Sequence, residues 1–176
     1  MILDLLRHGE PKGGRLYRGN QDDPLTQKGW GQMLDSTKGK QWDFIASSPL
    51  VRCFAFAKHL SDTSNTPYKI FKDLEELGFG DWQGKSSKEI GQDKVAQFKS
   101  DPTNNRPHNA ENLYVFQRRV LSTFKMIMDS KNDRQSVLII AHAGVIRTIK
   151  SHLLNFPIEK MFTMEVVSGS CERFEL

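Results

Sequence analysis

A run of five apolar residues, Val137–Ala141, constrains the fold of this chain more than any other segment. A strand with one face in water alternates apolar and polar residues, whereas this run has no polar position. Ile2–Leu6 and Phe44–Ala46 are further short strands of mainly apolar residues. Strands that helices cover on both faces have this composition, which is typical of parallel sheets in α/β proteins.

Helical segments alternate with these strands. Apolar residues spaced by three or four, from Leu113 to Ile127, predict a helix over 111–128. Thr26 is a candidate helix cap, and Ser48 followed by Pro49 is typical of a helix start. Further helices are expected over 26–36, 48–60 and 145–154, and further strands over 68–71 and 171–176, the last at an edge of the sheet.

The length of 176 residues fits one domain of about 100–200 residues. We therefore expect a single domain over 1–176, an α/β fold built as a three-layer α/β/α sandwich with a mostly parallel central sheet. Residues 10–24 are rich in Gly, Pro, Asn and Asp, which predicts a loop. Residues 78–110 predict an irregular excursion with short helices.

Several features favour a cytoplasmic protein with no membrane partner. No apolar run approaches the roughly 18–20 residues of a membrane span. Asp4 interrupts the N-terminal apolar segment where a signal peptide would continue. Cys53 and Cys171 lack metal-ligand spacing and are too few for a disulfide framework, which fits a reducing compartment.

The chain carries 25 Lys and Arg against 21 Asp and Glu, a formal net charge of +4. This surplus is compatible with a nucleic-acid surface or with a few arginines gathered at one anion site, and composition does not choose between them. The basic residues are scattered, and aromatic residues do not alternate with them. We therefore expect no nucleic-acid partner.

Cationic or imidazole side chains follow three of the predicted strands. Arg7 and His8 follow the first strand, Arg52 lies shortly after the second, and His142 follows Val137–Ala141. The carboxyl ends of parallel strands meet at one edge of the sheet, where ligands of open α/β folds bind. Helices that begin there point unpaired backbone amides at the same edge. The sequence thus predicts an anion site that contains two histidines, and phosphate is the ligand we expect there.

Five motifs around these corners resemble those of the histidine phosphatase superfamily, which includes the phosphoglycerate-mutase-like proteins. They cover nearly the whole chain in the family's order: Leu6–Glu10, Asp23–Gly29, Ala46–Cys53, Leu74–Gly84 and Ala141–Arg147. The resemblance implies a phosphoglycerate-mutase-like fold and a phosphoric monoester hydrolase.

The resemblance also implies roles for individual residues. His8 would be the nucleophile that takes the phosphoryl group, and Arg7, Arg52 and His142 would bind its oxygens. Glu76 would be the general acid, although sequence alone leaves open an exchange with its neighbour Glu75. Relatives line the substrate side with a loop that corresponds here to Glu10, Arg15, Arg18, Asn20 and Thr26.

Three departures from the family pattern stand out. Gln83 takes the place of a frequent Glu, and Ala143 that of a frequent Gly. Asn109-Ala110-Glu111-Asn112 stands where many relatives have Gly-Gly-Glu-Ser. Because this last segment borders the pocket in relatives, we expect it to affect the choice of substrate rather than the chemistry.

The implied mechanism passes through a phosphohistidine, since covalent catalysis splits one difficult transfer into two easier ones. Arginines would compensate the charge on the phosphoryl oxygens, so no metal and no other cofactor are expected. The chain also has no His-x-x-x-His motif or carboxylate cluster to hold a metal.

The superfamily contains both mutases and phosphatases. This chain lacks the longer insertions and C-terminal tail of the mutases, so we expect hydrolysis. Gly13–Gly19 and Asp22–Thr26 resemble the bacterial α-ribazole-5′-phosphate phosphatases of cobalamin biosynthesis. The expected partner is a small phosphorylated substrate such as α-ribazole 5′-phosphate, and sugar phosphates, protein phosphohistidine and mutase-type transfer remain alternatives.

A rival of another class is a non-catalytic phosphate-binding module that has kept the pocket. A degenerate module would be expected to have lost a member of the set, whereas His8, Arg7, Arg52, Glu76 and His142 are all present.

Overall fold

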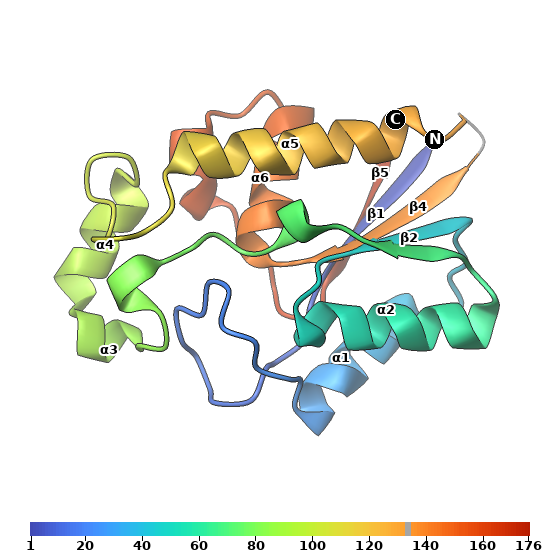
Figure 1. The fold of residues 1–176 in the computed structure, drawn as a ribbon, viewed down its shortest axis with the longest axis horizontal. Coiled ribbons are helices and arrows are strands. Elements are labelled where there is room, and N and C mark those ends of the chain that lie inside the picture. Colours follow the sequence, from blue (N-terminus) through green and yellow to red (C-terminus); the bar gives the residue numbers. More distant parts are fainter. Residues whose placement is uncertain (133–134) are drawn as a thin grey trace.

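The computed structural model describes residues 1–132 and 135–176 of the chain. Its centre is a five-stranded sheet in the order β3-β2-β4-β1-β5 (Figure 1). The strands are β1 (Ile2–Arg7), β2 (Phe44–Ser47), β3 (Tyr68–Ile70), β4 (Ser136–Ala141) and β5 (Cys171–Glu175). All neighbours pair in parallel except β5, which runs antiparallel to β1 at the edge. The expected edge strand and mostly parallel sheet are confirmed.

Helices cover both faces of this sheet. The α-helices are α1 (Gln27–Thr37), α2 (Val51–Ser64), α3 (Ser87–Ile90), α4 (Gln92–Ser100), α5 (Leu113–Asp129) and α6 (Ala143–Leu153). Three short 3₁₀ helices are η1 (Lys72–Leu74), η2 (Gly80–Trp82) and η3 (Ile158–Thr163). Figure 1 shows α1 and α2 on one face and α5 and α6 on the other, with α3 and α4 beyond one end of the sheet. The three-layer sandwich is confirmed, and η2, α3 and α4 lie within residues 78–110.

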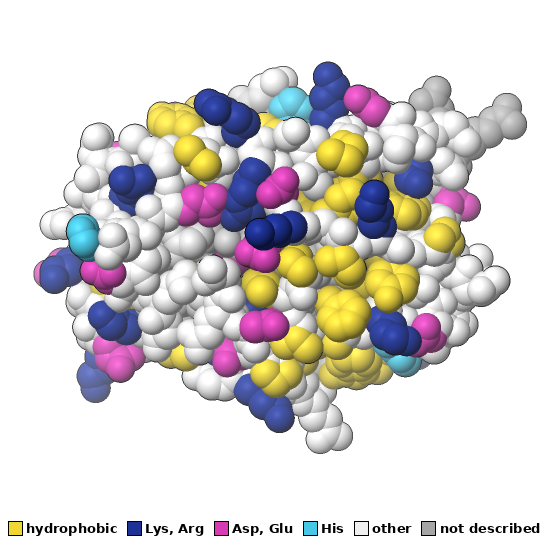
Figure 2. Space-filling view, in the orientation of Figure 1, with side chains coloured by type: hydrophobic (Ala, Val, Ile, Leu, Met, Phe, Trp, Pro, Cys, Tyr) yellow, Lys and Arg dark blue, Asp and Glu magenta, His cyan; other side chains and the backbone are white. Residues whose placement is uncertain are grey.

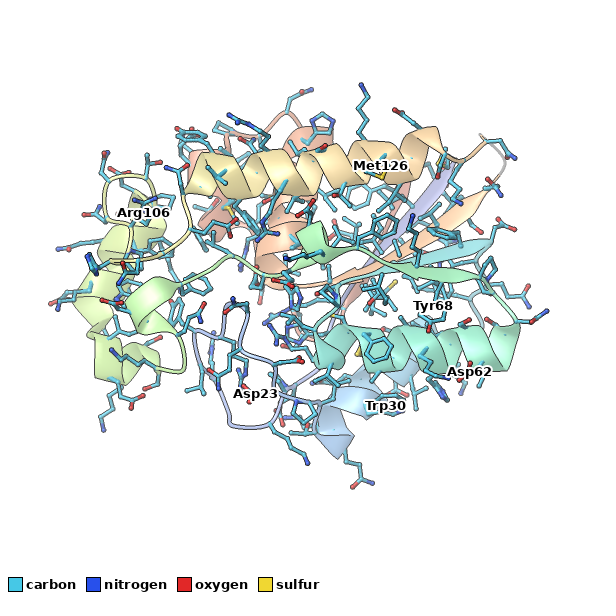
Figure 3. All side chains as sticks on the ribbon, viewed as in Figure 1. Asp23, Trp30, Asp62, Tyr68, Arg106 and Met126 are labelled. Atoms are coloured by element: carbon cyan, nitrogen blue, oxygen red, sulfur yellow. The ribbon has the colours of Figure 1, made fainter. Side chains whose placement is uncertain are left out.

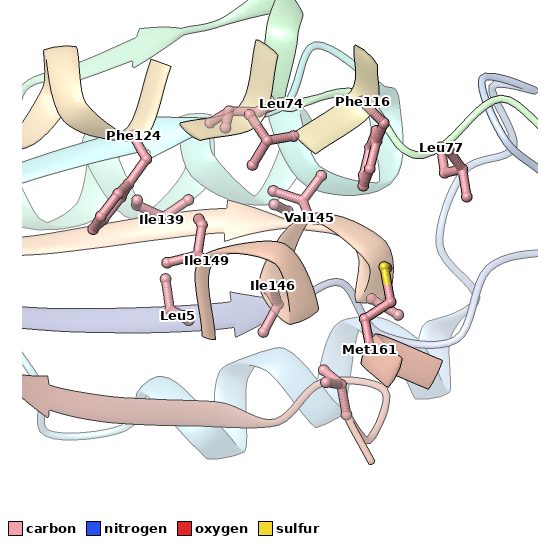
Figure 4. Packing of buried hydrophobic residues seen from close by; sticks show 14 of the residues in the cluster. Leu5, Leu74, Leu77, Phe116, Phe124, Ile139, Val145, Ile146, Ile149 and Met161 are labelled. Carbon is pink, nitrogen blue, oxygen red and sulfur yellow. The ribbon is translucent and has the colours of Figure 1, made fainter. Parts of the chain in front are cut away.

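The central strand β4 divides its side chains between two apolar clusters. Val137, Ile139 and Ala141 belong to the cluster under α5 and α6, whereas Leu138 and Ile140 belong to the cluster under α1 and α2. All five are fully buried. Figure 4 shows the first cluster, where side chains from α5 and α6 meet those of β1 and β4. Since successive side chains of a strand point to opposite faces, a strand that is buried on both sides has no polar position.

Two helices have bounds that differ from the sequence prediction. Helix α2 begins at Val51 rather than Ser48 and continues to Ser64 rather than Leu60. The Val51 amide donates to Asp22 Oδ1 at 2.6 Å, so a side chain from a distant loop satisfies the helix end. Helix α6 begins at Ala143, two residues earlier than predicted. Within the described residues, no helix is long and apolar enough to cross a membrane.

Candidate active site

The carboxyl ends of β1 and β4 place two histidines side by side. Arg7, the last residue of β1, pairs in register with Ala141, the last residue of β4. His8 and His142 follow these residues, and their ring centroids lie 5.1 Å apart in an edge-to-face arrangement. The structure therefore brings together the corners that the sequence predicted to converge.

His8 is held in one tautomer by the backbone of the next residue. Its Nδ1 lies 2.8 Å from the carbonyl oxygen of Gly9. A carbonyl only accepts hydrogen bonds, so Nδ1 carries the proton and Nε2 keeps a free lone pair. Burial, with the nearby charges of Arg52 and Arg7, holds the pKa of His8 well below its ordinary value. His8 is therefore a neutral imidazole at neutral pH, the form in which it is a nucleophile.

His142 is completely buried beside it. Its Nε2 lies 2.7 Å from Ser48 Oγ. Burial and the charge of Arg52 hold the pKa of His142 well below its ordinary value. Cys53 Sγ lies 3.8 Å from the same Nε2, and burial raises the pKa of this thiol to about 12. The Cys53 thiol thus stays protonated and is not a candidate nucleophile.

Arg7 and Arg52 are both held by backbone carbonyls on one side. Arg7 Nη1 donates to the Val166 carbonyl at 2.6 Å, and Arg52 donates to the carbonyls of Gln21 and Gly19 at 2.6 and 2.9 Å. The Nε of each arginine is buried and has no hydrogen-bond partner among the described residues. Buried donors without partners are costly, so this pair of guanidinium groups suits a phosphoryl group as acceptor.

Two backbone amides hold the Glu76 carboxylate. Gly144 N, in the first turn of α6, donates to Glu76 Oε2 at 3.1 Å, and Leu77 N donates to Oε1 at 2.9 Å. A Cβ atom on residue 144 would clash with Glu76 Oε1, so glycine at this position leaves room for the carboxylate where it lies. The charge of Glu76 acts on Arg7 and Arg52, which places it at the histidine edge. No hydrogen bond within the described residues joins the Glu75 carboxylate to this edge.

The loop over 10–24 contributes fewer free side chains than its composition suggests. Arg18 is 8% exposed and binds Asp23 through Nε at 2.9 Å, and its Nη2 donates to the carbonyls of Lys12 and Gly14. Figure 3 labels Asp23 on this loop. Thr26 caps α1 by accepting from Gly29 N at 2.9 Å, and its hydroxyl donates to Glu10. Arg18 and Thr26 therefore hold the loop together.

Arg15 and Asn20 are the two exposed candidates on the same loop. Arg15 makes no hydrogen bond within the described residues, and its charge acts on Arg7 and Tyr17. Asn20 Oδ1 accepts from Gln83 Nε2 at 2.9 Å, which ties the loop to the segment after Glu76. Of the two loop arginines, Arg15 is thus the one that remains available to a substrate.

The departures from the family pattern keep the local backbone geometry. Asn109 has a φ of 60°, a left-handed conformation that Asn tolerates better than most residues. Asn112 caps α5, since its Oδ1 accepts from Tyr114 N and Val115 N. Asn109 thus adopts a backbone conformation that glycine also favours, and Asn112 caps a helix as a serine can.

Sequence reasoning missed three supporting residues. Ser48, interpreted as a helix cap, holds His142 instead. Gly144 binds the Glu76 carboxylate. Arg147, partly buried one turn further along α6, donates to the Met164 carbonyl at 2.9 Å and interacts electrostatically with Glu76 and Arg7. The spacing of Arg147 from Gly144 would have placed both on one helix face.

A pocket of about 510 Å³ lies beside Glu76. Its lining includes three amide side chains, Asn20, Gln83 and Asn109, together with Glu75. Among residues 1–132 and 135–176, no group of three or more His, Cys, Asp or Glu side chains is arranged to hold a metal ion. Both cysteines are free.

Residues 3–176 match the family model of the histidine phosphatase superfamily (branch 1). An adenosylcobalamin/alpha-ribazole phosphatase of Salmonella typhimurium is 30% identical over 177 residues, which cover 96% of this chain and 87% of the relative. A glucosyl-3-phosphoglycerate phosphatase of Mycolicibacterium vanbaalenii is 28% identical over 172 residues, which cover 89% of this chain and 76% of the relative.

The fold is also that of solved relatives. The crystal structure of the alpha-ribazole phosphatase from Shigella flexneri superposes with a TM-score of 0.83 at 26% identity, over 98% of this chain and 89% of that one. The two curated relatives share the word phosphatase in their names but differ in substrate.

Proposed function

The chain belongs to the histidine phosphatase superfamily (branch 1) and is a phosphatase, and we propose that it hydrolyses a small phosphomonoester through a phosphohistidine formed on His8. The observation that carries the proposal is the state of His8. Its Nδ1 proton is donated to the Gly9 carbonyl, and burial together with two arginine charges keeps the ring neutral.

In the first step, His8 Nε2 attacks phosphorus in line with the leaving group. A phosphorus–nitrogen bond forms while the bond from phosphorus to the leaving oxygen breaks, and Glu76 gives its proton to that oxygen. The free Nε donors of Arg7 and Arg52 are suited to the phosphoryl oxygens, whose charge spreads in the transition state.

In the second step, water attacks the phosphohistidine. The Glu76 carboxylate takes a proton from the water, the phosphorus–nitrogen bond breaks, and inorganic phosphate leaves. His8 returns to its starting tautomer with its lone pair on Nε2. The cycle needs no metal, since the guanidinium groups supply the positive charge.

We propose α-ribazole 5′-phosphate as the substrate. The support is the resemblance of Gly13–Gly19 to the α-ribazole-5′-phosphate phosphatases and the names of the relatives from Salmonella typhimurium and Shigella flexneri. The free cysteines fit a reducing compartment, so we also propose a cytoplasmic location. Basic and acidic side chains intermingle on the face shown in Figure 2, which favours a small anion over a nucleic acid as partner.

The mechanism is tested with 4-nitrophenyl phosphate and the His8→Ala variant in excess chelator. We expect native turnover to be unchanged by the chelator, and rapid acid-free quenching to trap one labelled phosphoryl group per chain on native protein only. Undiminished turnover by His8→Ala, or full loss of native turnover with chelator, would overturn the mechanism.

The substrate is tested with a panel of compounds. It comprises α-ribazole 5′-phosphate, glucosyl-3-phosphoglycerate, a sugar phosphate and a phosphohistidine peptide, with a phosphoglycerate mutase assay alongside. We expect the highest kcat/KM for α-ribazole 5′-phosphate. A higher value for another compound, or mutase activity that exceeds hydrolysis, would replace this assignment.

A further inference from the structure

A bidentate ion pair between Glu111, which precedes α5, and Arg119, which lies within α5, contacts the segment that carries the candidate general acid. Arg119 Nε donates to Glu111 Oε1 at 2.7 Å, and Arg119 Nη2 donates to Glu111 Oε2 at 2.8 Å. Both side chains are about one-fifth exposed, and the guanidinium lies 4.7 Å from the centre of the Phe116 ring. We call Glu111 and Arg119 the α5 clamp.

The Arg119 guanidinium also donates hydrogen bonds to backbone carbonyls before Glu76 and at Glu76 itself. Arg119 Nη1 donates to the carbonyls of Asp73 and Glu75 at 2.7 and 2.9 Å. Arg119 Nη2 donates to the Glu76 carbonyl at 3.2 Å. The planar fork of an arginine can hold several acceptors in one fixed geometry, which the single ammonium group of lysine cannot reproduce.

The acid partner of the clamp grips the backbone after Glu76. Glu111 Oε2 accepts from Gly78 N at 3.2 Å, and the Glu111 amide donates to the Gly78 carbonyl at 2.8 Å. The α5 clamp therefore bonds to residues 73, 75, 76 and 78, on both sides of the candidate acid.

This support matters because Glu76–Phe79 has no helix or strand of its own. Backbone groups in such a segment need partners from elsewhere in the fold. The carbonyl of Glu76 and both backbone groups of Gly78 find theirs on the clamp. The Glu76 carboxylate extends from this held backbone to the Gly144 amide.

We infer that Glu111 and Arg119 are positioning residues, which keep the Glu76 carboxyl where it can give its proton to the leaving group. The inference rests on the acid role of Glu76 in the proposed function. Neither clamp residue is expected to touch the phosphoryl group, whose candidate ligands are Arg7, Arg52 and His142.

The test compares leaving groups in Arg119→Met and Arg119→Lys. A good leaving group such as 4-nitrophenolate needs no proton, whereas an alkoxide does. For an alkyl phosphate we expect kcat/KM to fall about 10- to 100-fold in both variants. This is less than the roughly 10²–10⁴-fold that a general acid contributes, because Glu76 is displaced and not removed. For 4-nitrophenyl phosphate we expect a fall of less than about threefold, and inhibition by inorganic phosphate should keep its native Ki.

Arg118→Met is the matched control. Arg118 is the adjacent arginine of α5, is exposed, and makes no hydrogen bond to the Glu76 segment within the described residues. It should leave both substrates unaffected. Glu111→Gln, which keeps an acceptor for Gly78 N but weakens the ion pair, should give a smaller split than Arg119→Met.

The Glu76→Gln variant tests the acid role of Glu76 separately from the positioning role of Arg119. If Glu76→Gln shows no difference between leaving groups, the acid role itself fails. The acid role requires Glu76→Gln to lower kcat/KM for the alkyl phosphate more than for 4-nitrophenyl phosphate. If it does so and Arg119→Met then lowers both values equally, or lowers neither, the positioning role is wrong. Circular dichroism and thermal unfolding of each variant identify a loss that comes from misfolding, which would lower both activities together.

Discussion

At the scale of single residues, the site combines buried positive charge with a buried neutral imidazole. A histidine in water has an ordinary pKa of about 6.5 and would be half protonated just below neutrality. His8 avoids this because burial, Arg52 and Arg7 all disfavour its imidazolium form. The arginines thus serve twice in the proposed mechanism, since they are suited to the phosphoryl group and also help to keep His8, the proposed nucleophile, unprotonated.

Arg52→Met should raise the pKa of His8 toward the ordinary value of 6.5. After burial, the charge of Arg52 has the largest effect against protonation of this ring, and the variant removes it. Nitrogen NMR of the imidazole ring would follow the titration directly. Arg106→Met changes an exposed arginine far from the site and should leave the titration unchanged (Figure 3). A His8 titration that is identical in Arg52→Met and native protein would contradict the argument.

Gly144→Ala should displace the Glu76 carboxylate, because the new Cβ would clash with its Oε1. We expect kcat/KM for an alkyl phosphate to fall about 10-fold or more, in line with the weight of one general acid. Gly31→Ala in α1 is the control, since nothing lies within 4 Å of its added Cβ. That substitution should leave activity intact and raise stability by about 0.5–1 kcal/mol. Native activity of Gly144→Ala would show that the carboxylate does not need this position.

At the scale of elements, one buried carboxylate joins the edge strand to the sheet. Asp4 in β1 is fully buried and accepts from Arg173 in β5 at 2.8 and 3.0 Å and from Trp42 Nε1 at 2.7 Å. Burial alone would raise the pKa of Asp4, but the hydrogen bonds from Arg173 and Trp42 outweigh it, so the pKa is lowered. Asp4, the polar residue within the first apolar segment, therefore links β1 to β5.

Asp4→Asn should destabilise the fold by about 1–3 kcal/mol at neutral pH, because it breaks a charge-assisted contact in a buried place. Since the folded pKa lies below the ordinary 3.8, the contribution is complete above that pH and is lost as the pH falls through the folded pKa. Urea unfolding at pH 7 and near pH 3 measures both effects.

Asp62→Asn removes an exposed carboxylate from α2 (Figure 3) and should change stability little at either pH. If Asp4→Asn has the same free energy of unfolding at pH 7 as the native protein, the contact of Asp4 with Arg173 does not stabilise the fold.

Elements whose signals are local were predictable from the sequence, and those fixed by distant partners were not. The apolar run Val137–Ala141 and the period of α5 each needed only their own residues. The start of α2 depends on Asp22, which is 29 positions away from Val51. The choice between Glu75 and Glu76 depends on Gly144, and Glu76–Phe79 has no period to settle it.

At the scale of the whole molecule, family motifs predicted which residues gather at the site, and tertiary contacts decided how each is used. Arg18 and Thr26 are predicted to bind substrate, and in the structure their polar atoms also bond within the chain around the loop over 10–24. Roles of this kind depend on which carbonyls and carboxylates the folded chain brings near a side chain. Part of the net charge of +4 is concentrated at one place, since Arg7 and Arg52 both act electrostatically on His8.

The unpartnered donors make the stability of the molecule depend on anions. A ligand that binds only the folded state stabilises it by about 2.7 kcal/mol at 100 times its Kd. For a chain of this size that corresponds to a rise in Tm of roughly 5–10 °C. We expect orthovanadate or inorganic phosphate to produce such a rise, because each supplies acceptors to Arg7 Nε and Arg52 Nε.

Thermal unfolding in phosphate and in sodium chloride of matched ionic strength separates specific binding from charge screening. Chloride should raise the Tm far less than phosphate does. Arg52→Met should lose most of the phosphate-dependent rise, because half of the guanidinium pair is gone, whereas Arg106→Met should keep it. Equal rises in chloride and phosphate, or an undiminished phosphate effect in Arg52→Met, would mean that the guanidinium groups of Arg7 and Arg52 do not form the anion site.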